Sequence, residues 1–169
     1  TSSLSRNATY LPQASSKAEF EQKIGYTEID ADYFRPNTNN RTVFGNLVPY
    51  GEVWRTGANN NTTVEFDTDV LVGGKPLLKG KYALYTIPNK TSWDIIFYQS
   101  NENWGNPKNW DDALVAAKVT VPVLTLKDKV ETFTIGFEDV NVNNGKLFIA
   151  WENSKVNVQV DAPTRQIAE

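Results

Sequence analysis

Residues 34–61 (FRPNTNNRTVFGNLVPYGEVWRTGANNN) combine Arg, Trp and Asn side chains without any regular period. An Arg side chain offers a planar fork of donors to carboxylate, phosphate or sugar hydroxyl groups and stacks on aromatic faces. Trp adds a rigid amphipathic surface, and Asn supplies both donors and acceptors. This mixture is typical of a site for a polar ligand, such as a glycan or a peptide terminus. The candidate residues are Arg35, Arg41, Trp54, Arg55, Asn59 and Asn60.

The same arginines also have a structural interpretation, which we favour. So long an irregular segment is uncommon in a compact domain, and its backbone polar groups need partners. Arg side chains would hold the segment by bonding backbone carbonyls or carboxylates. The candidate acids are Glu52, Asp30 and Asp32. We expect Arg35 and Arg55 to point toward residues 41–60 and to keep that segment rigid, whether or not a ligand also binds there.

A second polar segment, residues 100–112 (SNENWGNPKNWDD), carries Trp104 and Trp110 beside several amides and acids. The composition is compatible with sugar binding. Asp111 and Asp112 would suit calcium, which takes oxygen ligands, but EF-hand spacing is absent. We favour a structural role, in which the two Trp side chains close the open end of a sandwich and one of the aspartates caps a short helix.

Three missing residue types restrict the chemistry, because the sequence has no Cys, His or Met. Ser-His-Asp and Cys-His catalysis are excluded, and so are zinc sites built from imidazole or thiolate. A pair of carboxylates would suit glycoside hydrolysis, but nothing in the sequence selects a pair. The net charge of −3, without a basic cluster, argues against nucleic acid. We therefore expect no catalytic residue, no cofactor and no metal.

The elements that must position these segments are short strands. Alternating apolar and polar residues, with turn signals about every 8–12 residues, predict an all-β fold. The expected form is an antiparallel β-sandwich or jelly-roll-like barrel with long loops and at most one short helix, within residues 107–117. Trp93 and Trp151 lie in alternating stretches and are assigned to the core. The expected strands near the C-terminal end span 130–138, 146–151 and 155–160, with Asn144-Gly145 as a hairpin turn.

The domain organisation follows from the same pattern. Residues 1–16 are expected to form an N-terminal arm, residues 17–163 a single β domain and residues 164–169 a C-terminal tail. No apolar run is long enough to span a membrane. The chain begins at Thr1 without an initiator Met, from which we expect that an export signal was removed. The expected location is the periplasm, the outer membrane or the cell exterior.

The nonamer Gly51–Asn59 (GEVWRTGAN) strongly resembles a bacterial family, domain of unknown function 2911, which is common among Bacteroidetes. The resemblance covers about residues 17–160. It extends over several further motifs, among them Tyr33-Phe34-Arg35-Pro36, Val48-Pro49-Tyr50, Gly80-Lys81-Tyr82 and Trp151-Glu152. The resemblance implies an exported protein of a Gram-negative bacterium, and it transfers no catalytic residue. The sequence departs from the family at Phe34, where a small residue is usual, and at Asn40, where Gly is usual.

The function favoured by the sequence is a non-catalytic binding module for a glycan or another polar cell-envelope ligand. The alternative is a structural or accessory subunit that docks on an outer-membrane or secretion complex, and a carboxylate-based hydrolase ranks third. A concave polar cleft lined by Trp54 or Trp104 would favour the binding module. An exposed apolar patch would favour the subunit. The most useful single observation is whether those two Trp side chains share a solvent-filled pocket with Arg35 or Arg55.

Overall fold

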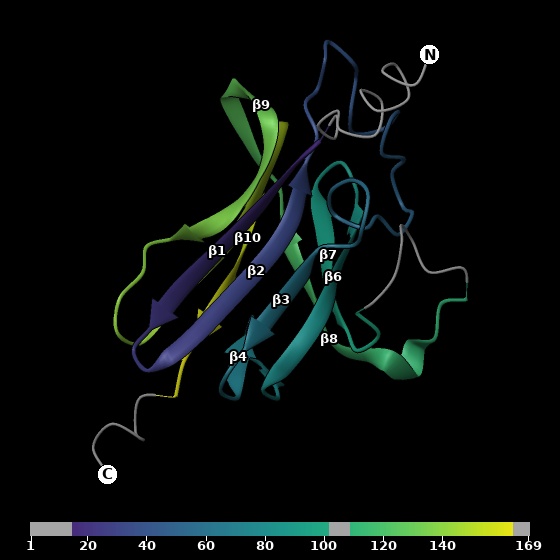
Figure 1. Cartoon of the computed structure of the whole chain (residues 1–169). Coiled ribbons are helices and arrows are strands. Elements are labelled where there is room, and N and C mark those ends of the chain that lie inside the picture. Colours follow the sequence, from purple (N-terminus) through teal and green to yellow (C-terminus); the bar gives the residue numbers. More distant parts are fainter. Residues whose placement is uncertain (1–14, 102–108, 164–169) are drawn as a thin grey trace, which may run out of the picture.

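Two antiparallel sheets pack face to face in the computed structural model, which describes residues 15–101 and 109–163 (Figure 1). The six-stranded sheet has the order β1 (Ser16–Ile24), β2 (Thr27–Arg35), β3 (Thr63–Phe66), β6 (Gly80–Pro88), β7 (Ser92–Tyr98) and β8 (Val115–Pro122). The four-stranded sheet has the order β5 (Lys75–Leu77), β4 (Val70–Val72), β10 (Asn144–Asp161) and β9 (Leu124–Glu138). The predicted β-sandwich is confirmed, and the described strands form no closed barrel.

The core lies between the sheets, and the period-2 pattern of the strands determines which side chains enter it. In β2 the buried residues are Thr27, Ile29, Ala31 and Tyr33, and the acids that alternate with them face outward. In β7, Trp93 is almost fully buried. Trp151 of β10 is equally buried, so the assignment of both tryptophans to the core is confirmed.

The C-terminal part of the sandwich differs from the sequence-based prediction, because β9 and β10 are longer than expected. The two strands predicted at 146–151 and 155–160 form one strand, β10, which pairs with β9. The pairing register shifts on either side of Glu152, whose φ is +56°. Such irregularities bend a strand without ending it. The bend explains why the alternation is interrupted in a continuous strand.

The β9–β10 hairpin is present, but Asn144-Gly145 is not its turn. Asn144 already begins β10, and the chain reverses over residues 139–143. The side-chain oxygen of Asn141 accepts hydrogen bonds from the N–H groups of Asn143 and Asn144, at 2.8 and 2.9 Å. The Asn141 side chain therefore replaces the type I′ geometry that the Asn-Gly pair predicts.

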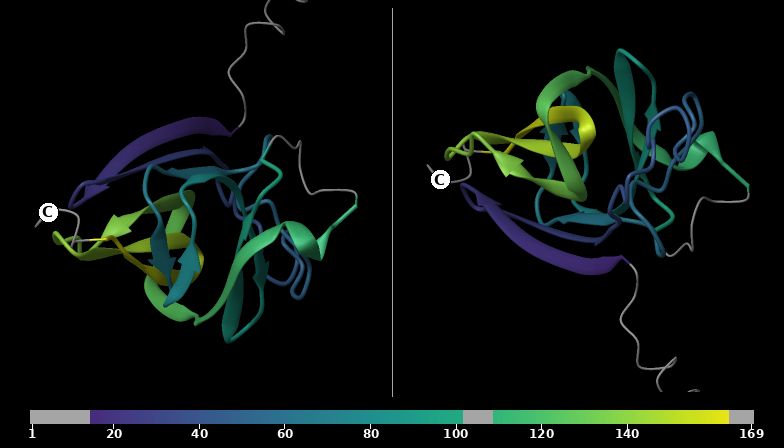
Figure 2. Two further views of the ribbon diagram at one scale, coloured as in Figure 1. Left: turned by 90° about the horizontal axis from the view of Figure 1, so that it is seen from below. Right: turned by 90° about the horizontal axis from the view of Figure 1, so that it is seen from above.

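Residues 36–62 connect β2 to β3 across one end of the sandwich, in blue near the top of Figure 1 and in the right-hand view of Figure 2. Backbone bonds attach this connection to β6, because Trp54 pairs with Thr86 and the N–H of Gly51 donates to the carbonyl of Pro88. The predicted short helix is a 3₁₀ turn, η1 (Asp112–Leu114). None of the helices in the described ranges is long and apolar enough to cross a membrane.

Candidate functional site

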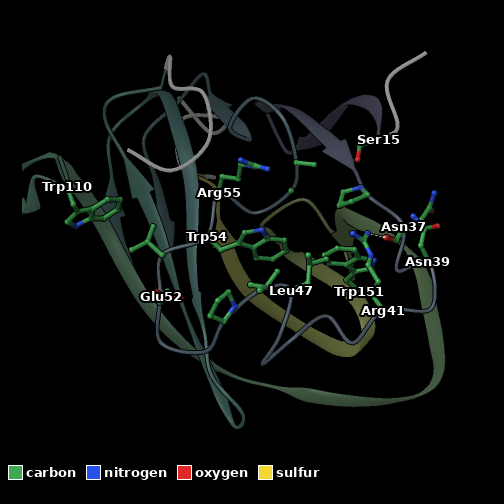
Figure 3. Close-up of a pocket in the computed structure, with 16 residues that line it drawn as sticks. Ser15, Asn37, Asn39, Arg41, Leu47, Glu52, Trp54, Arg55, Trp110 and Trp151 are labelled. Carbon is green, nitrogen blue, oxygen red and sulfur yellow. Dashed lines mark hydrogen bonds between the residues drawn. The ribbon is translucent and has the colours of Figure 1, made fainter. Parts of the chain in front are cut away.

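A cleft of about 790 Å³ opens beside the 36–62 connection (Figure 3). Trp110 lies at one end of it in that view and Asn39 at the other, with Trp54 and Arg55 between them. The walls are mixed, with apolar surface only slightly exceeding polar surface. The described residues that line the cleft include Pro36, Asn37, Leu47, Val48, Pro49, Glu52, Val53 and Trp151. A cleft that combines apolar walls with convergent polar groups is a usual form of a small-ligand site.

Trp54 belongs to the core as well as to the cleft. Its ring stacks on that of Trp151, with 5.9 Å between centroids and 11° between planes. Phe44, Trp93 and Phe133 pack against it edge to face. Only 9% of Trp54 is exposed. Trp54 therefore forms a rigid floor for the cleft and is not the open stacking platform that its loop position suggests.

Arg41 holds its own segment together. Its Nε donates to the carbonyl of Thr38 at 2.9 Å, and its Nη2 donates to the carbonyl of Asn37 at 2.7 Å. These bonds match the predicted structural role of an Arg that satisfies backbone carbonyls. Arg41 also lines the cleft. Two of its donor groups are therefore already used within the protein and are not free for a ligand.

Arg35 does not point toward residues 41–60, and that expectation is wrong. Its Nε donates to the carbonyl of Phe133 at 2.9 Å, and its Nη2 donates to Oγ1 of Thr134 at 3.0 Å. Both partners belong to β9 in the opposite sheet. Arg35 ends β2 and is thus directed across the sandwich, where it joins the two sheets.

The carboxylates that hold the connection come from the four-stranded sheet and not from the predicted acids. Glu152 accepts hydrogen bonds from the N–H groups of Val43 and Phe44, at 2.9 and 3.3 Å. Glu131 accepts from the Thr38 hydroxyl at 2.6 Å and from the Asn39 N–H at 3.1 Å. These two donors, first the Thr38 hydroxyl, lower the pKa of Glu131 below its ordinary value.

Arg55 differs from the other two described arginines. Its Nε is buried and has no hydrogen-bond partner, and the side chain forms no salt bridge with any described residue. These described contacts give no support to the expectation that Arg55 holds residues 41–60. The buried Nδ2 of Asn59 also lacks a partner. Buried polar groups are nearly always paired, so two unpaired donors four residues apart call for an explanation.

The backbone that carries Arg55 is strained and firmly held. Thr56, a β-branched residue, has a φ of +60°, which is rare for such residues, and Asn59 has a φ of +58°. The Thr56 hydroxyl lies 3.1 Å from the hydroxyl of Thr86, and the Thr62 hydroxyl donates to the Thr56 carbonyl at 2.6 Å. Strained residues of this kind persist only where surrounding contacts fix them, and they gather at functional sites.

Trp110 closes the other end of the cleft from the outer face of the six-stranded sheet. Its ring stacks on Tyr98 with 4.3 Å between centroids, and its Nε1 donates to Asp112 at 3.0 Å. It packs with a small apolar cluster on that face, so the predicted lid over the open end of the sandwich is in a different place. Asp111 accepts a hydrogen bond from the Ala113 N–H, which confirms the predicted helix cap.

The structure brings together part of the predicted site. Arg41, Trp54, Arg55 and Trp110 line the cleft, whereas Arg35, Asn59 and Asn60 are not among its lining residues. Trp104 lies outside the described residues. Sequence reasoning did not select several lining residues, namely Asn37, Asn39, Leu47, Val53 and Trp151. The Asn residues lie inside the segment that composition singled out, but nothing in the pattern distinguishes them from their neighbours.

A group of acids lies away from the cleft, on β1 and β2. Carboxylate oxygens of Glu21, Glu28 and Asp30 lie within 4.8 Å of one another at the surface. Repulsion from Asp30, and then from Glu21, raises the pKa of Glu28 above its ordinary value. Exposed acids on paired strands account for this arrangement without a ligand.

The fold and the cleft define an antiparallel β-sandwich protein with a candidate ligand site beside one long connection. The sequence profile of a family described as protein of unknown function (DUF2911) matches residues 15–160, and the chain belongs to this family. The family resemblance of the motif at residues 51–59 is thereby confirmed. Searches of curated proteins and of solved structures return no match.

Proposed function

We propose that this chain is a non-catalytic binding module for a glycan or another polar ligand of the cell envelope, and that the cleft around Arg55 is its binding site. The observation that carries the proposal is the buried, unpaired Nε of Arg55 in a cleft floored by Trp54. A buried donor without a partner costs free energy, and a ligand acceptor that bonds to it would remove that cost. Export to the periplasm or outer surface is part of the proposal.

Binding is favoured over hydrolysis by the acids present. Glu52 is the single carboxylate among the described residues that line the cleft. Glycoside hydrolysis of the common type needs two carboxylates that flank the scissile bond. The described part of the cleft therefore offers recognition groups without the pair that this chemistry requires.

An accessory subunit of an outer-membrane or secretion complex is the second candidate. Leu47 and Tyr50, both on the 36–62 connection, are 44% and 38% exposed. Exposed apolar side chains on one segment favour a protein partner. Leu47 also lines the cleft, so the same residue is compatible with a ligand that has an apolar part.

A panel of defined envelope glycans and peptidoglycan fragments tests the proposal. Wild-type protein and Arg55→Met are compared, with Lys23→Gln on β1 as a control that lies away from the cleft. We expect Arg55→Met to lose binding by at least about tenfold, because it removes a charge-assisted hydrogen bond, while Lys23→Gln binds like wild type. Equal binding by Arg55→Met and wild type would contradict the proposal.

A further inference from the structure

We propose that the ligand group received by Arg55 is a carboxylate, and that the ligand carries an apolar body along the cleft walls. This inference rests on the proposed function, because it names the chemical class of ligand for the same cleft. It selects an organic acid from the polar ligands that the proposed function covers.

The unpaired group of the cleft determines the kind of atom that the ligand must supply. Among the described residues that line the cleft, the buried side-chain atom without a partner is Nε of Arg55, and it is a donor. A buried donor left unpaired costs free energy, and the cost is greater for a charged group. A ligand that brings an acceptor removes this cost at Arg55. A ligand that brings only donors does not.

The charge balance favours an anion over a neutral acceptor. Two guanidinium groups line the cleft, and Arg41 already gives two of its donors to backbone carbonyls. Glu52 is exposed, and it forms no salt bridge with a described Lys or Arg. The positive charge of Arg55 is thus not neutralised by a contact within the described residues. Charge-assisted hydrogen bonds are about twice as strong as neutral ones.

The position of Arg55 is fixed before any ligand arrives. Gly57, two residues on, has a φ of +149°, and an added Cβ there would lie 3.0 Å from the carbonyl oxygen of Phe34. The Thr56 and Thr62 hydroxyl contacts hold the same turn. A donor that is preorganised in this way binds without the entropy loss of ordering a loop.

The walls distinguish a carboxylate from a phosphate. The planar guanidinium edge matches the two oxygens of a carboxylate, and it also binds phosphate. Leu47, Val48, Pro49 and Val53 contribute apolar surface to the same cleft. A doubly charged, strongly hydrated group loses more solvation against such walls than a singly charged one. A carboxylate attached to an apolar body fits both the cation and the walls.

Nuclear magnetic resonance of the ¹⁵N-labelled full chain tests this inference through the Nε–Hε signals of the arginines. Acetate, acetamide, hexanoate, glucuronate and inorganic phosphate are titrated separately at constant ionic strength. The Nε of Arg35 and the Nε of Arg41 serve as internal controls, because each already donates to a backbone carbonyl.

We expect acetate to shift the Arg55 Hε signal saturably, with acetamide at least about tenfold weaker and the two control signals unmoved. Hexanoate should bind at least about tenfold more tightly than acetate, because its methylene groups become buried. No shift with acetate, or equal shifts with acetamide, would contradict the proposal that Arg55 receives a carboxylate. Tighter binding of phosphate than of acetate would also contradict it. Tighter binding of glucuronate than of hexanoate would contradict the proposal that the ligand has an apolar body. In each case Arg55-dependent binding on the glycan panel would still support the proposed function.

Discussion

The Nε of Arg35 donates a hydrogen bond of 2.9 Å to the carbonyl of Phe133, and this contact joins the last residue of β2 to β9 in the opposite sheet. A second bond runs from Nη2 to Oγ1 of Thr134. Arg35 is therefore a structural residue, and it lies outside the cleft. Arg55 has the same side-chain chemistry, but its buried Nε has no hydrogen-bond partner.

Arg35→Met should destabilise the fold. Methionine keeps an apolar stem but removes both donors, and hydrogen bonds to charged groups contribute about 1.5–3 kcal/mol. We expect a loss of that order in the free energy of unfolding, measured with urea. Lys23→Gln, at an exposed position of β1, should stay within about 0.5 kcal/mol of wild type. A wild-type value for Arg35→Met would mean that the contact with β9 adds nothing.

Thr62→Val should loosen the turn that carries Arg55. The Thr62 hydroxyl, which is fully buried, donates to the Thr56 carbonyl at 2.6 Å. Removal of this donor should cost about 1–3 kcal/mol, because it leaves a buried acceptor without this partner. The matched control is Thr63→Val, at a half-buried position of β3, which should remain within about 0.5 kcal/mol of wild type. Equal effects of the two substitutions would argue against a specific role for the Thr62 hydroxyl.

Much of the fold was predictable from the sequence, because alternation along each strand decides which side chains are buried. Ile29, Ala31 and Tyr33 of β2 follow this rule. The pairing of strands was not predictable in the same way. Interruption of the alternation near Glu152 predicts two strands, whereas the tertiary pairing with β9 carries β10 through the irregularity as one strand.

The candidate site was predicted only as a region. Composition singled out residues 34–61, part of which lines the cleft, but it could not assign roles to the three arginines of that segment. Those roles depend on which carbonyls the folded chain places near each guanidinium, and Phe133 is 98 positions from Arg35 in the sequence. The core position of Trp54 could not be predicted for the same reason, since its stacking partner Trp151 lies in β10, far away in the sequence.

Glu131→Gln should change the response of the protein to acid. The pKa of Glu131 is lowered in the folded state, so its contribution to stability is present above the ordinary value of 4.5 and is lost as pH falls through the lowered folded pKa. We expect wild type to have the higher thermal midpoint at pH 7, and the difference from Glu131→Gln to shrink below pH 4.5. A difference that stays constant down to strongly acidic pH would contradict this assignment.

Glu28→Gln should have the opposite effect. Because Asp30 and Glu21 raise the pKa of Glu28, the folded state binds its proton more tightly, and stability falls as pH rises from 4.5 through the raised folded pKa. The substitution should therefore raise the thermal midpoint at pH 7 and low salt. The gain should diminish in high salt, which screens exposed charges. An unchanged or lower midpoint at pH 7 and low salt would show that the repulsion is already relaxed.

Arg55→Met provides the most direct test of the claim that Arg55 serves a ligand and not the fold. Urea unfolding of Arg55→Met, Arg35→Met and wild type is measured under one set of conditions without added ligand. The unpaired Nε of Arg55 predicts that Arg55→Met stays within about 0.5 kcal/mol of wild type or becomes more stable. A loss of about 1.5–3 kcal/mol in Arg55→Met, like that expected for Arg35→Met, would show that Arg55 holds the structure and would contradict the account.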